Sequence, residues 1–228
     1  MSAEPILSYR EVVAGYAKPV VGPVSFDLGP GDVLGLVGPN GCGKSTLIGA
    51  LTGTSKVLSG EVVRKPGTTI AYQRQRPVRE TDVPLRADEL LRLTAATAEP
   101  PPSLRPLLKT RVDRLSGGQF QLLTVWACLG GEAGLVILDE PTNNMDPDAV
   151  AALSELLLSS RGDRAVLVVT HDADDGDFCT QPSGRYAHIA GLAGSDAAPV
   201  RTELLFSPAR HLPDTGDHQI EVQVACDA

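Results

Sequence analysis

The sequence lacks an excess of basic residues. Its 20 Lys and Arg residues are outnumbered by 28 Asp and Glu residues, so the formal net charge at pH 7 is −8. Binding to a nucleic-acid duplex normally requires clustered Lys and Arg side chains that neutralise phosphates. This composition therefore argues against nucleic acid as the main partner.

Long apolar runs and paired cysteines are also missing. No uninterrupted apolar run approaches the roughly 20 residues that a membrane-spanning helix needs, and residues 1–5 show no charged-then-apolar export pattern. The cysteines at 42, 128, 179 and 226 form no C-x-x-C pair and have no histidine at zinc-ligand spacing. We therefore expect a cytoplasmic chain with free thiols.

The composition is that of a globular protein with one or two lobes. The chain has 228 residues, against about 150 residues for a typical domain, and 42% hydrophobic content supports a buried core. Apolar patterns predict strands at residues 6–13, 20–28, 32–37, 135–138 and 165–169. Helical patterns and helix-start signals predict helices at residues 47–51, 87–98, 120–129 and 147–160, the last with Asp146 as its N-cap. Continuous apolar strands on either side of a helix are typical of a parallel sheet covered on both faces.

A glycine-rich stretch follows the strand predicted at 32–37. Residues 38–45 fit the pattern G-x-x-x-x-G-K-[ST], in which glycines let backbone N–H groups surround a phosphate at the start of a helix. We expect Lys44 to reach the β- and γ-phosphates of a nucleotide, Ser45 to bind Mg²⁺, and Thr46 to donate to a phosphate oxygen. The competing interpretation is a glycine-rich turn without a ligand.

Two acidic residues follow the apolar run at 135–138. Asp139 ends this predicted strand, at the edge of the sheet where open α/β folds bind ligands. We expect its carboxylate to hold Mg²⁺ through a water molecule or through Ser45. Glu140 comes next, and a carboxylate in that place can orient an attacking water as a general base. Taken alone, the two acids could equally cap the next turn.

Two further sequence features support a nucleotide-binding function only in combination with this loop. Residues 115–119 (LSGGQ) place Ser116 and Gln119 at the spacing of a capping box for the following helix. The two glycines between them leave the helix N-terminus bare, so capping and phosphate binding can coexist. His171 follows the run at 165–169, near the same sheet edge as Asp139, where a histidine could hydrogen-bond a γ-phosphate. A lone histidine is otherwise usually structural.

Together, these residues resemble the nucleotide-binding domain of ATP-binding cassette (ABC) proteins over roughly residues 5–191. Residues 38–46 match the Walker A motif, residues 135–139 match Walker B, and residues 115–119 match the family signature. The resemblance implies an α/β fold with a P-loop NTPase core of the ABC type, an antiparallel β subdomain and a helical subdomain. The short interval between the glutamine loop and the signature implies that this helical subdomain is shortened.

The resemblance also implies a domain organisation. Residues 1–191 would form the ABC ATPase domain, with the helical subdomain inserted at about 77–129. Residues 192–228 would form a C-terminal extension with candidate strands at 202–206 and 219–225.

The resemblance further implies an ATPase that uses ATP and Mg²⁺. Its catalytic residues would be Glu140 and His171, and its Mg²⁺ ligands Ser45, Gln75 and Asp139. Tyr16 matches the aromatic residue that stacks on adenine, with a core tyrosine as the alternative, and the family pattern selects Gln75 over Gln73 as the glutamine of the glutamine loop. The residues implied to bind nucleotide are Tyr16, Gly38, Pro39, Asn40, Gly41, Cys42, Gly43, Lys44, Ser45, Thr46, Gln75, Ser116, Gly117, Gly118, Gln119 and Asp146.

In this family two domains enclose two ATP molecules, each between the Walker A motif of one domain and the signature of the other. The resemblance therefore implies a homodimer or a paired ABC ATPase subunit. Because the sequence has no membrane span, a transporter would need a separate membrane permease subunit. The chain would then lie in the cytoplasm, on the inner face of the cell membrane.

The function that the resemblance implies is the ATPase subunit of an ABC importer, in which ATP closes the dimer and hydrolysis opens it. Residues 82–85 and 118–121 resemble the ATPases of zinc and manganese importers, which implies a metal ion as cargo. The alternative is a soluble ABC ATPase that acts as a regulatory or translation-associated module, since residues 140–146 resemble that group. A DNA-repair cassette would need a long coiled coil, and the sequence has no sustained heptad run.

Overall fold

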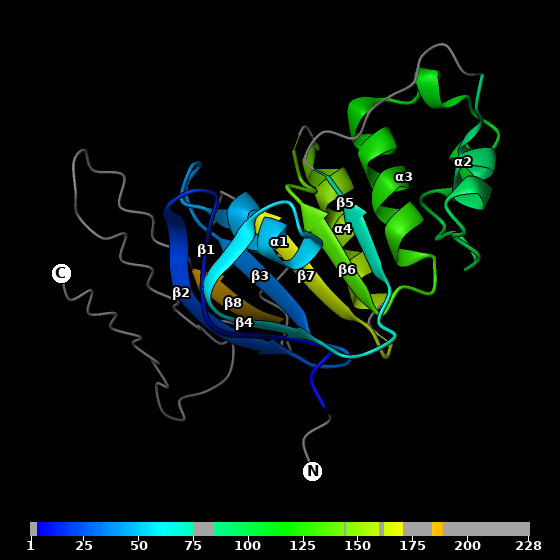
Figure 1. The fold of residues 1–228 in the computed structure, drawn as a ribbon. Helices are drawn as coiled ribbons and strands as arrows, with labels where there is room; N and C mark the ends of the chain where they lie inside the picture. The colour runs from blue at the N-terminus through cyan, green and yellow to red at the C-terminus, as the bar shows by residue number, and fades with distance from the viewer. Residues whose placement is uncertain (1–3, 75–83, 144, 160–161, 171–183, 189–228) are drawn as a thin grey trace, which may run out of the picture.

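The computed structural model of the chain describes residues 4–74, 84–143, 145–159, 162–170 and 184–188. In these residues two sheets and a set of helices form a layered α/β fold (Figure 1). No helix of this described part has both the length and the apolar character needed to cross a membrane. The candidate strands at 202–206 and 219–225 lie outside the described residues.

A five-stranded parallel sheet forms the centre, in the order β5-β6-β7-β3-β8. Its strands are β3 (Val33–Val37), β5 (Ile70–Gln73), β6 (Leu135–Asp139), β7 (Ala165–Thr170) and β8 (Gly184–His188). Every residue of β3, β6 and β7 is buried. Both faces of these strands are covered, which is why their sequences are continuous rather than alternating apolar runs. The predicted strand at 32–37 and the two predicted central strands at 135–138 and 165–169 are confirmed.

The two faces of this sheet belong to two separate apolar clusters. Along β6, Leu135 and Ile137 pack on the side of α1 (Lys44–Thr52), while Val136 and Leu138 pack on the side of α3 (Gly117–Leu129) and α4 (Pro147–Ser159). Because side chains alternate across a strand, Asp139 continues the row of Ile137 and faces the side of α1. The alternation therefore aims this carboxylate toward the loop that begins α1.

The register brings the ends of three strands to one edge. Asp139 at the end of β6 is the partner of Val169 on β7, and Val37 at the end of β3 is the partner of Thr170 on β7. The loop that follows β3 and the acids at the end of β6 thus lie at the same carboxyl edge of the sheet, as the sequence predicted.

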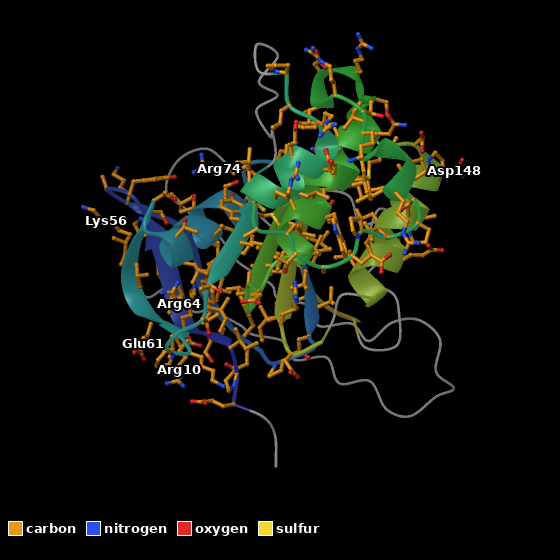
Figure 2. All side chains as sticks on the ribbon, turned by 90° about the vertical axis from the view of Figure 1, so that its right-hand side faces the viewer. Arg10, Lys56, Glu61, Arg64, Arg74 and Asp148 are labelled. Atoms are coloured by element: carbon orange, nitrogen blue, oxygen red, sulfur yellow. The ribbon has the colours of Figure 1, made fainter. Side chains whose placement is uncertain are left out.

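A three-stranded antiparallel sheet covers α1 on its other side (Figure 1). Its order is β2-β1-β4, with β1 (Leu7–Gly15), β2 (Pro19–Leu28) and β4 (Lys56–Arg64). The Tyr9 hydroxyl donates to the backbone oxygen of Leu47 on α1 at 2.9 Å, which ties this sheet to the helix. Arg10 and Glu61 lie opposite each other on β1 and β4 and form an exposed ion pair at 3.9 Å (Figure 2).

Of the remaining helices, α3 and α4 lie on the other face of the parallel sheet, and α2 (Ala87–Leu93) packs against α3 (Figure 1). Short 3-10 turns lie at Arg105–Leu107 and Val112–Arg114. The N-cap prediction for α4 is confirmed, because Asp146 Oδ1 accepts from the backbone N–H of Ala149 at 2.8 Å. The prediction that the helix at 87–98 would reach Ala98 is wrong. Ala95 adopts φ 55°, a left-handed conformation that an α-helix cannot continue through.

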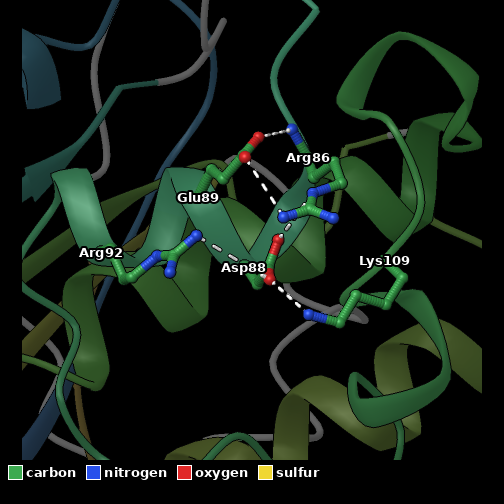
Figure 3. Close-up of polar contacts among 5 residues, drawn as sticks. All are labelled: Arg86, Asp88, Glu89, Arg92 and Lys109. Atoms are coloured by element: carbon green, nitrogen blue, oxygen red, sulfur yellow. Dashed lines mark hydrogen bonds and ion pairs between the residues drawn. The ribbon is translucent and has the colours of Figure 1, made fainter.

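Asp88 is the centre of a charged cluster at the start of α2 (Figure 3). Its carboxylate pairs with Lys109 at 2.8 Å, Arg86 at 3.4 Å and Arg92 at 3.9 Å. The hydrogen bond from Lys109 lowers the pKa of the Asp88 carboxyl, while partial burial raises it by less. Because Lys109 lies between the two 3-10 turns, this ion pair joins α2 to the segment that leads to α3.

Candidate nucleotide site

The loop between β3 and α1 exposes backbone N–H groups at the start of a helix. Its N-cap is Gly43, at φ 102°; no side chain of the described residues caps the helix, and its first turn has no acidic residue. Gly41 has φ 85°, and a Cβ added there would meet nothing within 4 Å in the described part of the chain, which leaves that side of the loop open. A bare helix N-terminus with left-handed glycines before it is the geometry that backbone groups use to bind a phosphate.

Lys44 is bent back over this loop. It is 7% exposed, and its Nζ donates to the backbone oxygens of Gly38 at 2.5 Å and Pro39 at 3.1 Å. These two bonds anchor the ammonium group across the loop, beside the bare helix start. A buried cation next to unpaired N–H groups makes the loop a preformed site for an anion.

The acids of β6 face this loop across a pocket. The pocket is lined by Val20, Asn40, Gly41, Gly43, Lys44, Ser45, Thr46, Asp139 and Glu140. The structure therefore brings together the predicted phosphate loop and both predicted acids, which are about 95 residues apart in the sequence. Cys42, in the same loop, is buried and does not line the pocket.

Glu140 stands at a strained position directly after β6. Its φ is 52°, and its backbone N–H donates to the oxygen of Val169 at 2.8 Å. On the signature helix α3, Gln121 places its Nε2 3.5 Å from the Glu140 backbone oxygen. A left-handed backbone at a residue other than glycine costs roughly 1–2 kcal/mol. Glu140 is 2% exposed and lines the pocket at this left-handed turn.

Asp139 is held by Tyr72, a residue that was not among the predicted site residues. The Tyr72 hydroxyl on β5 donates to Asp139 Oδ2 at 3.1 Å. Burial raises the pKa of the Asp139 carboxyl, the Tyr72 hydrogen bond lowers it, the nearby Glu140 charge raises it and Lys44 lowers it. Burial and the Asp139 charge raise the pKa of Tyr72 to about 12, so Tyr72 is a neutral donor at neutral pH. The sequence feature that could have identified Tyr72 is its position on a short strand just before Gln75.

The signature residues form a capping box, as predicted. Ser116 Oγ accepts from the Gln119 N–H at 3.2 Å, and the Ser116 N–H donates to Gln119 Oε1 at 3.0 Å. Ser116, Gly117 and Gln119 are exposed, and none of residues 116–119 lines the described pocket. Within one chain, the signature and the phosphate loop are thus separate surfaces.

The other predicted residues fall in different places. Tyr16 is 58% exposed, so the alternative of a core tyrosine is wrong, and it does not line the described pocket. Asp146 is exposed and caps α4. Gln75 and His171 lie outside the described residues. Val20, which was not among the predicted site residues either, lines the pocket next to the loop.

The residues present fit a nucleotide with Mg²⁺. Among the described residues no group of three or more His, Cys, Asp or Glu side chains could hold a metal alone. The pocket instead offers a hydroxyl and a carboxylate, Ser45 and Asp139, beside an anion-binding loop. Mg²⁺ is typically bound by one or two such oxygens together with substrate phosphates and water, so this donor set is suited to a metal that arrives with phosphates.

Comparison with known proteins agrees with this geometry. Residues 21–143, more than half of the chain, match the ABC transporter family. The chain belongs to this family.

Individual relatives refine the comparison. The zinc import ATP-binding protein ZnuC of Paracoccus denitrificans (strain Pd 1222) is 38% identical over 163 residues, which cover 68% of this chain and 64% of that protein. ZnuC of Yersinia enterocolitica is 35% identical over 165 residues, which cover 68% of this chain and 66% of the relative. The matched region therefore spans slightly less than two thirds of these relatives.

Comparison with solved structures agrees with this family assignment. The solved structure of an ATP-binding subunit of an ABC transporter superposes with a TM-score of 0.66 at 26% identity, covering 80% of this chain and 85% of that chain. The predicted α/β fold of the ABC type is confirmed.

Proposed function

We propose that this chain is the ATP-hydrolysing subunit of an ABC importer with a metal ion as cargo. The observation that carries the ATPase proposal is the convergence of the phosphate loop, Asp139 and Glu140 on one pocket. The family match and the zinc-import relatives support the transport role and the cargo. The same relatives offer no support for a regulatory or translation-associated module.

The phosphate loop is the binding element for the ATP phosphates. Its glycines expose N–H groups, and Lys44 contributes a buried positive charge that offsets the phosphate charge. Lys44 bridges to loop carbonyls in this structure, so phosphate oxygens would replace those partners. Thr46 lines the same pocket and supplies a further donor.

Ser45, Asp139 and Gln75 are the proposed Mg²⁺ ligands. The metal, when bound, offsets charge on the phosphate oxygens. Asp139 is 7% exposed and faces the loop that carries Ser45, which supports a shared site. Gln75 is included as a proposed ligand because of the family resemblance.

Glu140 is the proposed general base and His171 the proposed γ-phosphate sensor. Glu140 lines the pocket together with Asp139 and has a left-handed backbone there, which supports this role. From there, it can accept a proton from water that attacks the γ-phosphate. His171 enters this proposal through the family resemblance and its place directly after β7.

The proposed active unit is a dimer of two ATPase subunits, either two copies of this chain or this chain with a related one. The exposed signature residues 116–119 do not line their own chain's pocket, which supports their use on a partner's ATP. Asp146 and Tyr16, both exposed, are proposed to contact nucleotide in the closed dimer. Closure does work on an attached protein because ATP binds the closed state more tightly than the open state.

The proposed partner is a separate membrane permease, which would hold the chain on the inner face of the cell membrane. A pull-down tests this partner. Tagged Glu140→Gln protein is added with ATP to detergent-solubilised cells, and co-purifying proteins are identified. Slow hydrolysis in this variant should keep the ATP-bound complex closed and raise recovery of a multi-span membrane protein.

A matched variant controls for non-specific capture. The double variant Lys44→Ala with Glu140→Gln loses the buried cation and should bind ATP weakly, so it should recover much less of the same protein. Recovery of ribosomes or of soluble proteins alone would contradict the importer and favour the regulatory module.

A further inference from the structure

A tyrosine on the neighbouring strand holds the carboxylate of Asp139. In the parallel register of β5 and β6, Tyr72 is the partner of Ile137, two residues before Asp139. The side chains of Ile137 and Asp139 leave the same face of β6, so the long tyrosine side chain extends along that face to Asp139. The resulting hydrogen bond, at 3.1 Å, joins residues 67 positions apart in the sequence.

The ring of Tyr72 has neighbours on two sides. It packs against the apolar cluster on the α1 side of the sheet, and Arg74 Cζ lies 6.0 Å from the ring centroid. Arg74 directly follows β5, and Figure 2 shows it apart from Arg10, Glu61 and Arg64. These contacts favour the ring orientation in which the hydroxyl reaches Asp139.

Asp139 needs such a partner for a physical reason. It is 7% exposed, lies next to Glu140, which is 2% exposed, and lines the pocket. A desolvated carboxylate is stabilised by a donor, and a carboxylate already held in one orientation loses less side-chain entropy when it binds a ligand. The Tyr72 hydroxyl does both through a single oxygen, Oδ2.

We propose that Tyr72 is a positioning residue for the Mg²⁺ site, whose hydroxyl orients the Asp139 carboxylate for the metal–nucleotide complex. This inference rests on the proposed role of Asp139 as an Mg²⁺ ligand. It assigns to β5 a part in metal binding that is separate from the part proposed for Gln75. Phe at this position would keep the ring, its packing and the contact with Arg74, and would lose only the hydrogen bond.

Nucleotide binding with and without metal tests the inference. The affinity of the full chain for a fluorescent, non-hydrolysable ATP analogue is measured in Mg²⁺ and in EDTA, and the ratio of the two affinities is the metal-dependent gain. In Tyr72→Phe we expect this gain to fall about tenfold, with the affinity in EDTA unchanged. Hydrolysis should need a higher Mg²⁺ concentration for half-maximal rate, with little change in the rate at saturating Mg²⁺.

Tyr9→Phe is the matched control, because Tyr9 is also a buried tyrosine whose hydroxyl makes one hydrogen bond, to Leu47. We expect Tyr9→Phe to lower thermal stability and leave the metal-dependent gain at the wild-type value. A purely structural role for Tyr72 would lower both affinities alike, or lower only stability, and would overturn the inference.

Asp139→Asn separates failure of the inference from failure of the proposed site. If Asp139→Asn loses the metal-dependent gain while Tyr72→Phe keeps it, the Mg²⁺ site stands and the positioning role is wrong. If Asp139→Asn keeps the gain as well, the proposed metal site is wrong and the inference falls with it.

Discussion

Gly43 shows how one residue sets the shape of the phosphate loop. It stands at φ 102°, and a Cβ added there would lie 2.6 Å from the Cβ of Val21 on β2. The loop thus depends on close contact with the antiparallel sheet, in addition to its own glycine-rich sequence. Val20, the neighbour of Val21, lines the pocket, so the same strand both supports the loop and forms part of the site.

Gly43→Ala should therefore impair both folding and binding. We expect a loss of about 2–4 kcal/mol in the free energy of unfolding, from left-handed strain together with the overlap with Val21, and a large loss of ATP affinity. Urea unfolding and ATP-analogue titration measure the two effects.

Gly53→Ala is the control for left-handed strain alone. Gly53 has φ 80°, and a Cβ there would meet nothing within 4 Å. Gly53→Ala should lower the free energy of unfolding by about 1–2 kcal/mol and leave ATP affinity near wild type. Equal losses of affinity in the two variants would contradict the role of the Val21 contact.

At the scale of elements, charge ties α2 to the segment that precedes the signature helix. The pKa of Asp88 is lowered mainly by its hydrogen bond with Lys109, so the carboxyl binds its proton less readily in the folded chain than in the unfolded chain. A lowered folded pKa contributes stability that is present above the unfolded pKa, about 3.8, and is lost as the pH falls through the folded value.

Asp88→Asn should consequently destabilise the chain near pH 6, by about 1 kcal/mol for a largely exposed network. The difference in free energy of unfolding between this variant and the wild type should shrink as the pH falls below about 4, because protonation removes the same charge from the wild-type Asp88. Urea unfolding of both proteins between pH 6 and pH 3 measures the difference. A difference that stays constant with pH would rule out the ionised Asp88 as its cause.

The signature helix α3 is a second element that a single change can test. Ser116→Ala removes the side chain that accepts from Gln119 and should lower stability by about 1 kcal/mol. Ser116→Asp keeps an N-cap acceptor, so its stability should stay near wild type. Its negative charge should nevertheless weaken ATP-dependent dimerisation, measured by light scattering. Normal dimerisation of Ser116→Asp would argue against phosphate binding by the signature.

At the scale of the whole molecule, the described pocket is lined by the phosphate loop and the two acids, but not by the signature residues. In a closed two-fold assembly, each surface of one chain faces the complementary surface of the other. Two such chains would therefore form two sites, each built from both copies.

Mixing two inactive variants tests this arrangement. Lys44→Ala damages the phosphate loop, and Gly117→Asp places a negative charge on the signature. A Cβ at Gly117 would meet nothing within 4 Å, and an acid suits the first turn of a helix, so the fold should tolerate Asp.

Each variant alone should hydrolyse ATP very slowly, whereas an equal mixture should recover up to about a quarter of wild-type turnover. In random pairing half of the dimers are mixed, and each mixed dimer holds one intact site. Turnover assays on the single variants and on the mixture provide the comparison. Mixed dimers that form without any gain in turnover would contradict a site shared between chains.

Much of this fold was predictable because its signals are local. Buried parallel strands read as continuous apolar runs, and the caps at Ser116 and Asp146 follow from side chains a few residues away. β4 was not predicted, because six consecutive residues from Lys56 to Glu61 are exposed and carry no apolar alternation. The end of α2 was misplaced, because the left-handed Ala95 has no sequence signal comparable to glycine.

The sequence by itself determined the chemistry of the phosphate loop, since all the groups of that loop are contiguous from Gly38 to Thr46 and its glycines specify the backbone. Only the tertiary structure decided how distant groups meet. Strand register set the Tyr72 hydroxyl against Asp139, and the packing of β2 set Val21 against Gly43. Such contacts depend on which strands pair and which faces are buried, and these are properties of the whole core rather than of any local segment.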